Sequence, residues 1–185
     1  MNSEKLIDYG KRWALLALGM FVAASGISLI TQTHLGTTPI SSLPYTITGL
    51  TGLTFGTTTF IVNVVFFVIE WLFLKKRGVF HAFMCFQVPV VFVFSAFIDF
   101  TMTPAAAVMP SGYIPRFIVS FLGNAILALG IVMQIHSRTI VQPGEGIVLA
   151  ESVFFRHPFG TMKVVNDWSL VIIACIVALI FTGGI

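Results

Sequence analysis

Long runs of hydrophobic residues without any charge dominate the sequence. No Asp, Glu, Lys or Arg occurs between residues 13 and 69, and further uncharged runs cover 78–98, 117–137 and 168–185. A helix that spans a bilayer needs about 20 apolar residues. Each of these runs is long enough, so the pattern predicts an all-α polytopic membrane protein.

Glycine and proline divide these runs into long and short elements. The expected long helices cover 13–33, 56–74, 79–100, 115–137 and 160–182, and two short elements interrupted by Pro or Gly cover 38–52 and 142–156. The order long, short, long therefore occurs twice, and the helix at 79–100 lies between the two copies. The short elements are the places where the chain either spans fully or enters the membrane and returns.

Special residues coincide when the second half is laid on the first. Gly123 follows Gly19 by 104 positions, and the same interval separates Gly130 from Gly26 and Pro143 from Pro39. Gly and Pro mark special backbone or close packing, so their shared spacing indicates a duplication. The expected division is a first repeat with its trailing helix at 1–105 and a second repeat at 106–185. The counterpart of that trailing helix would start near Gly183, so the expectation is either a fold one helix short or a truncated copy of a longer protein.

The repeated glycines have a spacing that suits helix packing. Gly19 and Gly26 are two turns apart, with Ala23 between them on the same face, and Gly123 and Gly130 repeat that interval. Small residues on one face let two helices approach closely in lipid. A structural role is the leading interpretation of these glycines.

Composition supports the membrane class. Hydrophobic residues make up 57% of the chain and charged residues only 9%, whereas soluble domains carry about 25% charged residues. Lipid is therefore the expected partner, and the sequence has no basic stripe that would bind nucleic acid. The basic N-terminus and Val22-Ala23-Ala24 resemble a cleaved signal peptide, but the apolar run continues past them, which favours a retained helix. The two cysteines, Cys85 and Cys175, lie in apolar runs and predict neither a disulfide nor a metal site.

Basic residues near membrane ends favour the cytoplasmic side, which distinguishes the two topologies. If both short elements are re-entrant and Met1 is cytoplasmic, nine of the 10 Lys and Arg residues lie on the cytoplasmic side and only Arg116 lies outside. If both elements span, Lys75–Arg77 and Arg138 move outside and the split becomes six to four. The charge rule favours re-entrance, and re-entrance makes the two repeats inverted relative to each other.

Interrupted segments at matching positions of inverted halves indicate the binding site of a transporter. The first opens with Gly36-Thr37-Thr38-Pro39 and the second with Gln142-Pro143-Gly144-Glu145. A proline at this position is also a common first residue of a helix, and that simpler explanation stays open. The candidate substrate-binding residues are Gly36, Thr37, Thr38, Pro39, Ser41, Asn63, Pro143, Glu145, Lys163, Asn166 and Asp167.

Ionisable residues in apolar helices are the second indication of a site, because they are costly there. Lys163 and Asp167 are four residues apart and are expected to neutralise each other on one helix face. Asn63 and Asp167 are equivalent in the two repeats. Glu145 and Glu151 depend on the re-entrant arrangement, whereas Glu70 and Asp99 lie near helix ends and are expected to reach the headgroups. None of the common catalytic or cofactor motifs occurs, and the four histidines have no metal-ligand spacing, so neither an enzyme nor a cofactor is expected.

Two stretches resemble the YczE/YyaS/YitT family of bacterial integral membrane proteins. Leu35-Gly36-Thr37-Thr38-Pro39 matches its Leu-Gly-x-x-Pro turn, and Thr51-Gly52-Leu53-Thr54-Phe55-Gly56-Thr57 matches the stretch that follows. In the second half Pro143-Gly144-Glu145-Gly146 and Lys163 with Asp167 stand where that family has a Pro-x-Asp-Gly turn, a basic and an acidic residue. Glu145 in place of Asp, and Ile40-Ser41 in place of Pro-Trp-Asp, depart from the family.

The resemblance implies a multi-pass protein of the bacterial cytoplasmic membrane that is related to transport. The first functional hypothesis is a transporter or permease subunit for a small solute, acting as a homodimer with a cytoplasmic N-terminus. The alternative is a non-transporting accessory protein that binds a partner, and a membrane-embedded enzyme ranks third.

Overall fold

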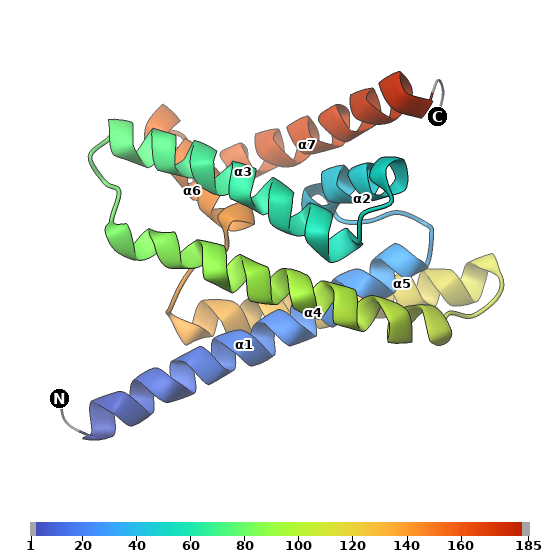
Figure 1. The fold of residues 1–185 in the computed structure, drawn as a ribbon, viewed down its shortest axis with the longest axis horizontal. Coiled ribbons are helices and arrows are strands. Elements are labelled where there is room, and N and C mark those ends of the chain that lie inside the picture. The colour runs from blue at the N-terminus through green and yellow to red at the C-terminus, as the bar shows by residue number, and fades with distance from the viewer. Residues whose placement is uncertain (1–2, 183–185) are drawn as a thin grey trace. The chain divides into compact units, whose positions relative to one another are not determined.

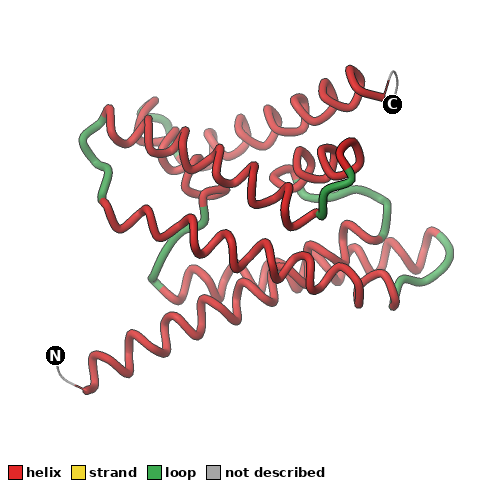
Figure 2. Tube along the Cα trace, in the orientation of Figure 1, coloured by secondary structure: helices red, strands yellow, loops and turns green. Residues whose placement is uncertain are grey.

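The fold is helical throughout the described part of the chain. The structure, a computed structural model, describes residues 3–182, with side chains from residue 8 to residue 181, and these residues form helices joined by short loops (Figure 2). The elements are α1 (Ser3–Gln32), α2 (Pro39–Thr51), α3 (Phe55–Lys76), η1 (Ala82–Phe86), α4 (Gln87–Ala107), α5 (Tyr113–Ser137), α6 (Pro143–Phe155) and α7 (Phe159–Thr182). The predicted order of long and short helices is confirmed. The expectations about Met1 and about a helix near Gly183 fall outside the described residues.

Among the described residues, five segments are long and apolar enough to cross a membrane. They lie in α1, α3, the continuous η1–α4 segment, α5 and α7. The helices α2 and α6 have 13 residues each, which is about 20 Å at about 1.5 Å per residue. The hydrocarbon core of a bilayer is about 30 Å thick, so neither short helix reaches across it alone. The predicted fold class, an all-α polytopic membrane protein, is confirmed.

The first residues of the short helices explain where those helices begin. Pro39 and Pro143 each occupy the first turn of a helix, where the missing N–H of proline costs nothing. Thr38 precedes Pro39 and accepts a hydrogen bond from the backbone N–H of Ser41, at 3.3 Å. This side chain satisfies one of the free N–H groups at the start of α2.

The start and end of α4 differ from the expectation. The predicted helix at 79–100 is wrong in its bounds, because α4 begins at Gln87 after a short 3-10 helix and continues to Ala107. Pro89 falls in the first turn of α4, where proline is tolerated. Asp99 does not end the helix, although the charge-free run stops there. The positions of charged residues show which part of a helix is apolar, but they do not show where the backbone helix begins and ends.

The helices form two compact units, each of which takes helices from both sequence repeats. Unit 1 contains α1, α5 and the part of α4 from Ala96, and unit 2 contains α2, α3, η1, the part of α4 up to Ser95, α6 and α7. Figure 1 labels these helices along the chain. The division at residue 105 describes a duplication of sequence and stays a prediction.

Unit 1 is built on close contact between α1 and α5. A Cβ on Gly26 would lie 2.7 Å from the carbonyl oxygen of Gly123, and a Cβ on Gly19 would lie 3.0 Å from the carbonyl oxygen of Gly130. As the residue number rises along α1, the number of the contacted residue falls along α5, so the two helices are antiparallel. The predicted packing role of these four glycines is confirmed.

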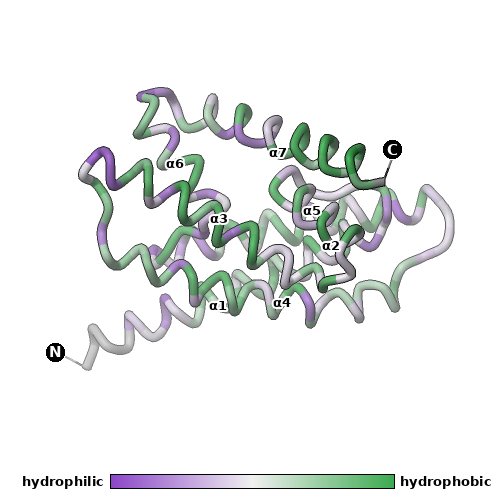
Figure 3. The backbone as a smooth tube through the Cα atoms, turned by 45° about the horizontal axis from the view of Figure 1, so that its top comes forward, coloured by the Kyte–Doolittle hydropathy of each residue, from purple (hydrophilic) through white to green (hydrophobic). Residues whose placement is uncertain are grey.

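Unit 2 has a hydrophobic core to which its helices contribute. The α3–α6 and α2–α7 pairs are its most extensive helix contacts, and the buried cluster consists of Val62, Phe66, Ile147, Val148, Met162 and Leu170. Figure 3 shows that α7 is hydrophobic in its C-terminal half and carries hydrophilic positions nearer its start. The polar residues of α7 therefore lie on a helix whose remainder is suited to lipid or to the core.

Candidate functional site

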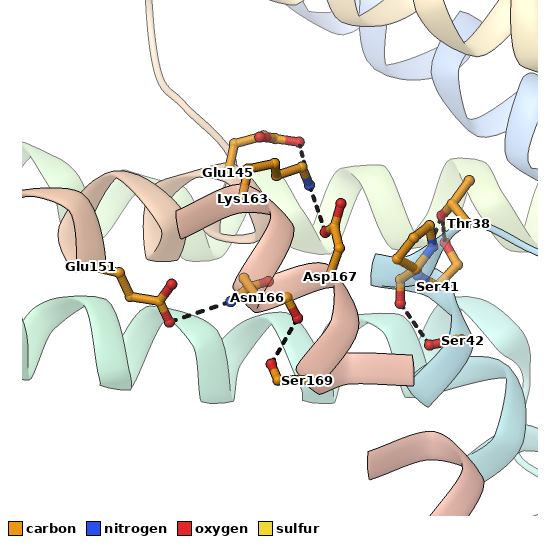
Figure 4. Close-up of polar contacts among 10 residues, drawn as sticks. Thr38, Ser41, Ser42, Glu145, Glu151, Lys163, Asn166, Asp167 and Ser169 are labelled. Atoms are coloured by element: carbon orange, nitrogen blue, oxygen red, sulfur yellow. Dashed lines mark hydrogen bonds and ion pairs between the residues drawn. The ribbon is translucent and has the colours of Figure 1, made fainter. Parts of the chain in front are cut away.

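The polar residues of unit 2 gather around Lys163. Its Nζ atom lies 3.0 Å from Oδ1 of Asp167 and 3.5 Å from Oε1 of Glu145. The first pair lies within α7, where residues four apart share a face, and the second joins α7 to the first turn of α6. The predicted pairing of Lys163 with Asp167 is confirmed, and the structure adds Glu145 as a second carboxylate on the same ammonium (Figure 4).

A second polar contact lies on the same two helices. Nδ2 of Asn166 donates a hydrogen bond of 3.4 Å to Oε1 of Glu151, and Oγ of Ser169 donates one of 2.7 Å to the backbone oxygen of Asn166. Asn166 is buried, and its Oδ1 has no hydrogen-bond partner. A buried amide oxygen without a partner usually faces water or a ligand. The sequence alone does not determine the depth of Glu151, and the structure places it in contact with Asn166.

Asn63 occupies in α3 the place that Asp167 occupies in α7. Each residue is eight positions after the first residue of its helix, Phe55 or Phe159, which is about 12 Å along the helix. Nδ2 of Asn63 donates to the carbonyl oxygen of Thr59 at 2.8 Å, and its Oδ1 lies 3.7 Å from where a Cβ on Gly144 would stand. Asn63 therefore lies against Gly144 at the start of α6, and Gly144 is the residue directly before Glu145.

The hydroxyl-rich start of α2 belongs to unit 2 only from Thr38 onward. Oγ1 of Thr38 donates to Oγ of Ser41 at 2.9 Å, and Figure 4 draws these residues together with the charged residues of α6 and α7. Gly36 and Thr37 belong to unit 1, where the hydroxyl of Thr37 lies 3.1 Å from that of Thr31. The structure thus brings together the unit 2 candidates on α6 and α7, and it assigns Gly36 and Thr37 to the other unit.

Two of the polar residues in unit 2 were not among the sequence candidates. Glu70 was expected to reach the headgroups, and that expectation is wrong, because the side chain is 2% exposed and accepts a hydrogen bond from Nε2 of Gln87 at 3.0 Å. Gln142, the residue before α6, has a buried Nε2 without a partner. No motif marks Glu70. The only sequence signal was a carboxylate within an apolar run.

Comparison with known proteins assigns the chain to a family but not to an activity. A profile described as a family of unknown function, DUF6198, matches residues 10–185. Neither the curated proteins nor the solved structures contain a significant match to the chain. The family description names no activity and carries no name that links it to YczE/YyaS/YitT.

Proposed function

Because the chain belongs to the DUF6198 family, whose function is unknown, its activity has to be inferred from its own residues, and we propose that it binds a small solute and moves it across a membrane. One observation carries the proposal: Lys163 of α7 bridges Asp167 of the same helix and Glu145 of α6, although α7 is long and apolar enough to cross a membrane. Charged groups in such helices are costly and mark the paths of solutes or ions. The resemblance to YczE/YyaS/YitT supports a bacterial cytoplasmic membrane as the location.

The charge balance of the site suits a polar solute with a cationic group. The site has two acidic residues, Glu145 and Asp167, for the one basic residue Lys163. Their side chains are between about a quarter and two-fifths exposed, so a solute can reach them. The Oδ1 of Asn166 adds an acceptor without a partner. No catalytic step and no cofactor enter this proposal.

Two inverted repeats are the arrangement that we propose for this activity. Exchanging the two repeats turns the Gly19–Gly130 contact into Gly123–Gly26, which also occurs in unit 1. In unit 2 the same exchange turns the α2–α7 pair into the α6–α3 pair, and both pairs occur. These symmetric contacts support an inverted duplication, and the inversion agrees with the charge rule that favours re-entrant short helices and a cytoplasmic N-terminus.

Cysteine labelling tests this topology. In a background with Cys85 and Cys175 replaced by alanine, a cysteine at exposed Lys76 is expected to react only with a reagent that reaches the cytoplasmic side. A cysteine at exposed Ser111, in the loop after α4, is the matched position and is expected to react from outside. The reason is that re-entrant α2 leaves one crossing, α3, between the outer side and Lys76. The opposite labelling of the two positions would disprove the proposed topology.

Solute binding is tested with Asp167→Asn in the purified protein. A cognate solute at about 100 times its Kd is expected to stabilise the wild type by about 2.7 kcal/mol, which raises its melting temperature by roughly 5–10 °C. Asp167→Asn is expected to lose this shift, because the site loses one negative charge and Lys163 loses one of its two carboxylate partners. The measurement is thermal unfolding in nanodiscs against a panel of small polar solutes, followed by uptake into proteoliposomes.

The matched control is Asp8→Asn, which removes an exposed carboxylate that pairs with Arg12 at 2.9 Å on α1. This variant is expected to keep the full solute response. If no solute stabilises the wild type, or if Asp167→Asn keeps a detected uptake, the transport proposal is wrong. A stoichiometric protein partner that co-purifies in the absence of solute binding would favour the accessory role, in which the same charges hold a partner.

A further inference from the structure

Glu70 is a carboxylate in the interior of unit 2 that forms no ion pair with the described charged residues of α6 and α7. It lies in α3 and is 2% exposed. A Cβ on Gly146 of α6 would stand 2.5 Å from its Oε2 and 2.8 Å from its Oε1. The backbone of α6 therefore packs directly on the carboxyl group, and the glycine is what makes room for it.

One hydrogen bond reaches this carboxyl group, and it comes from Gln87. Nε2 of Gln87 donates to Oε1 of Glu70 at 3.0 Å. The other two polar atoms of the pair, Oε2 of Glu70 and Oε1 of Gln87, are buried and have no hydrogen-bond partner among the described residues. Both are oxygens, and in an ionised carboxylate and an amide both can only accept. A buried acceptor without a donor costs about 1–3 kcal/mol. One additional hydrogen atom on either oxygen would provide the donor that this pair is missing.

No cation among the described residues supplies that hydrogen. The helices packed on α3 in unit 2 carry few ionisable groups near it: α2 has only Tyr45, and α4 has none up to Ser95. On α6, Glu145 binds Lys163 and Glu151 binds Asn166. The basic residues of α3 itself, Lys75 and Lys76, are exposed at its end, and no ion pair joins them to Glu70 in the described part of the chain.

We propose that Glu70 and Gln87 form a proton-binding site, in which Oε2 of Glu70 carries the proton and donates it in a hydrogen bond to Oε1 of Gln87. A carboxylic acid and a primary amide each present one donor and one acceptor side by side, so two parallel hydrogen bonds satisfy all four polar positions. Exchanging the oxygen and nitrogen of the Gln87 amide would place two acceptors against each other and would again require a proton.

The site gives α3 a contact with α4 and α6 that depends on the proton. Release of the proton leaves a buried charge against the closely packed α6, where no cation among the described residues neutralises it, and this favours separation of α3 from α6. The site could then couple the movement of a solute to the movement of protons, and this role rests on the proposed function. The existence of the proton-binding site does not.

The experiment compares wild type with Glu70→Gln by thermal unfolding in detergent between about pH 5 and about pH 9. A proton bound only in the folded state stabilises that state less as pH rises. The wild-type melting temperature is therefore expected to fall by about 5 °C or more across this range. Glu70→Gln is uncharged and keeps the shape of the acid, so it is expected to match the wild type at low pH and to lose most of this fall. Asp8→Asn is the matched control and is expected to keep it.

Three results would overturn the proposal. The first is an unchanged pH dependence in Glu70→Gln, and the second is failure of that variant to fold, because a neutral side chain of this shape is the native form of the site. The third is a melting temperature of the wild type at high pH that is higher in sodium chloride than in choline chloride, with no such difference in Glu70→Gln. That result would assign the site to a metal cation. Infrared spectra of the wild type at neutral pH are expected to show a protonated carboxyl band that Glu70→Gln lacks. These measurements need no solute, so they separate this inference from the transport proposal.

Discussion

Gly130→Ala is expected to destabilise the packing of α1 on α5, although it adds a single methyl group. The new Cβ would lie 2.7 Å from Cα of Ala23 and 2.8 Å from its Cβ. These atoms belong to the backbone and the methyl side chain of Ala23, so no side-chain rotation relieves the overlap. The two helices have to move apart, and overpacking of this kind costs about 1–3 kcal/mol.

The same argument applies on the other side of the helix pair. A Cβ on Gly26 would stand 2.8 Å from Cα of Leu127 in α5. The double variant Gly26→Ala/Gly130→Ala is expected to lose less than the sum of the single losses, because helices already separated by the first methyl group accept the second more easily. Thermal unfolding in detergent measures all three variants, and each kcal/mol lowers the melting temperature by roughly 2–4 °C in a chain of this length.

Gly10→Ala is the matched control for these variants because Gly10 also lies in α1. No atom of the described residues lies within 4 Å of a Cβ on Gly10. Without an overlap, the better helix propensity of alanine is expected to stabilise α1 by up to about 1 kcal/mol. Equal stability of Gly130→Ala and Gly10→Ala would contradict the close packing of α1 on α5.

Lys163→Met is expected to remove solute binding and to destabilise unit 2 at the same time. The substitution keeps the length of the side chain but leaves Glu145 and Asp167 without their shared cation. The three side chains are 26–39% exposed, so the loss lies between that of a surface pair, about 0–1 kcal/mol, and that of a buried pair, about 3–5 kcal/mol. We expect about 1–3 kcal/mol in thermal or denaturant unfolding, from the same two principles.

The triple variant Glu145→Gln/Lys163→Met/Asp167→Asn separates folding from function. It has no charge at any of the three positions, so no carboxylate is left unpaired and stability is expected to recover most of the loss. Solute binding is expected to stay absent, because the charges that recognise the solute are gone. A triple variant that binds solute like the wild type would show that the three charges serve only the fold.

Local features of the sequence were enough to predict the parts of the site that lie on one helix. Lys163 and Asp167 meet because four residues bring side chains onto one face of any α-helix. The starts of α2 and α6 follow from Pro39 and Pro143, which suit the first turn and are poor residues for a helix interior. The repeated glycines identified the packing face of α1 and α5 because only residues without a side chain allow such an approach.

Contacts between helices were not predictable in the same way. From the sequence, Glu70 is expected to reach the headgroups because it lies only a short distance from the end of an apolar run. That distance says nothing about which helix covers the side chain, and here Gln87 and Gly146 surround it. The predicted bounds of α4 are wrong for a related reason. The charge-free length of a segment follows from the lipid around it, whereas the bounds of a helix follow from its backbone hydrogen bonds.

The sequence by itself determined that this protein is an all-helical membrane protein, where its short helices begin, and which glycines face another helix. These properties depend on hydropathy, backbone sterics and helical periodicity, all of which act over a few residues. Only the tertiary structure decided that α1 packs on α5 and α3 on α6, that Glu145 reaches Lys163, and that Glu70 is buried against Gly146. Such partners are chosen by the fit of whole helix faces, which residues far apart in the chain create together.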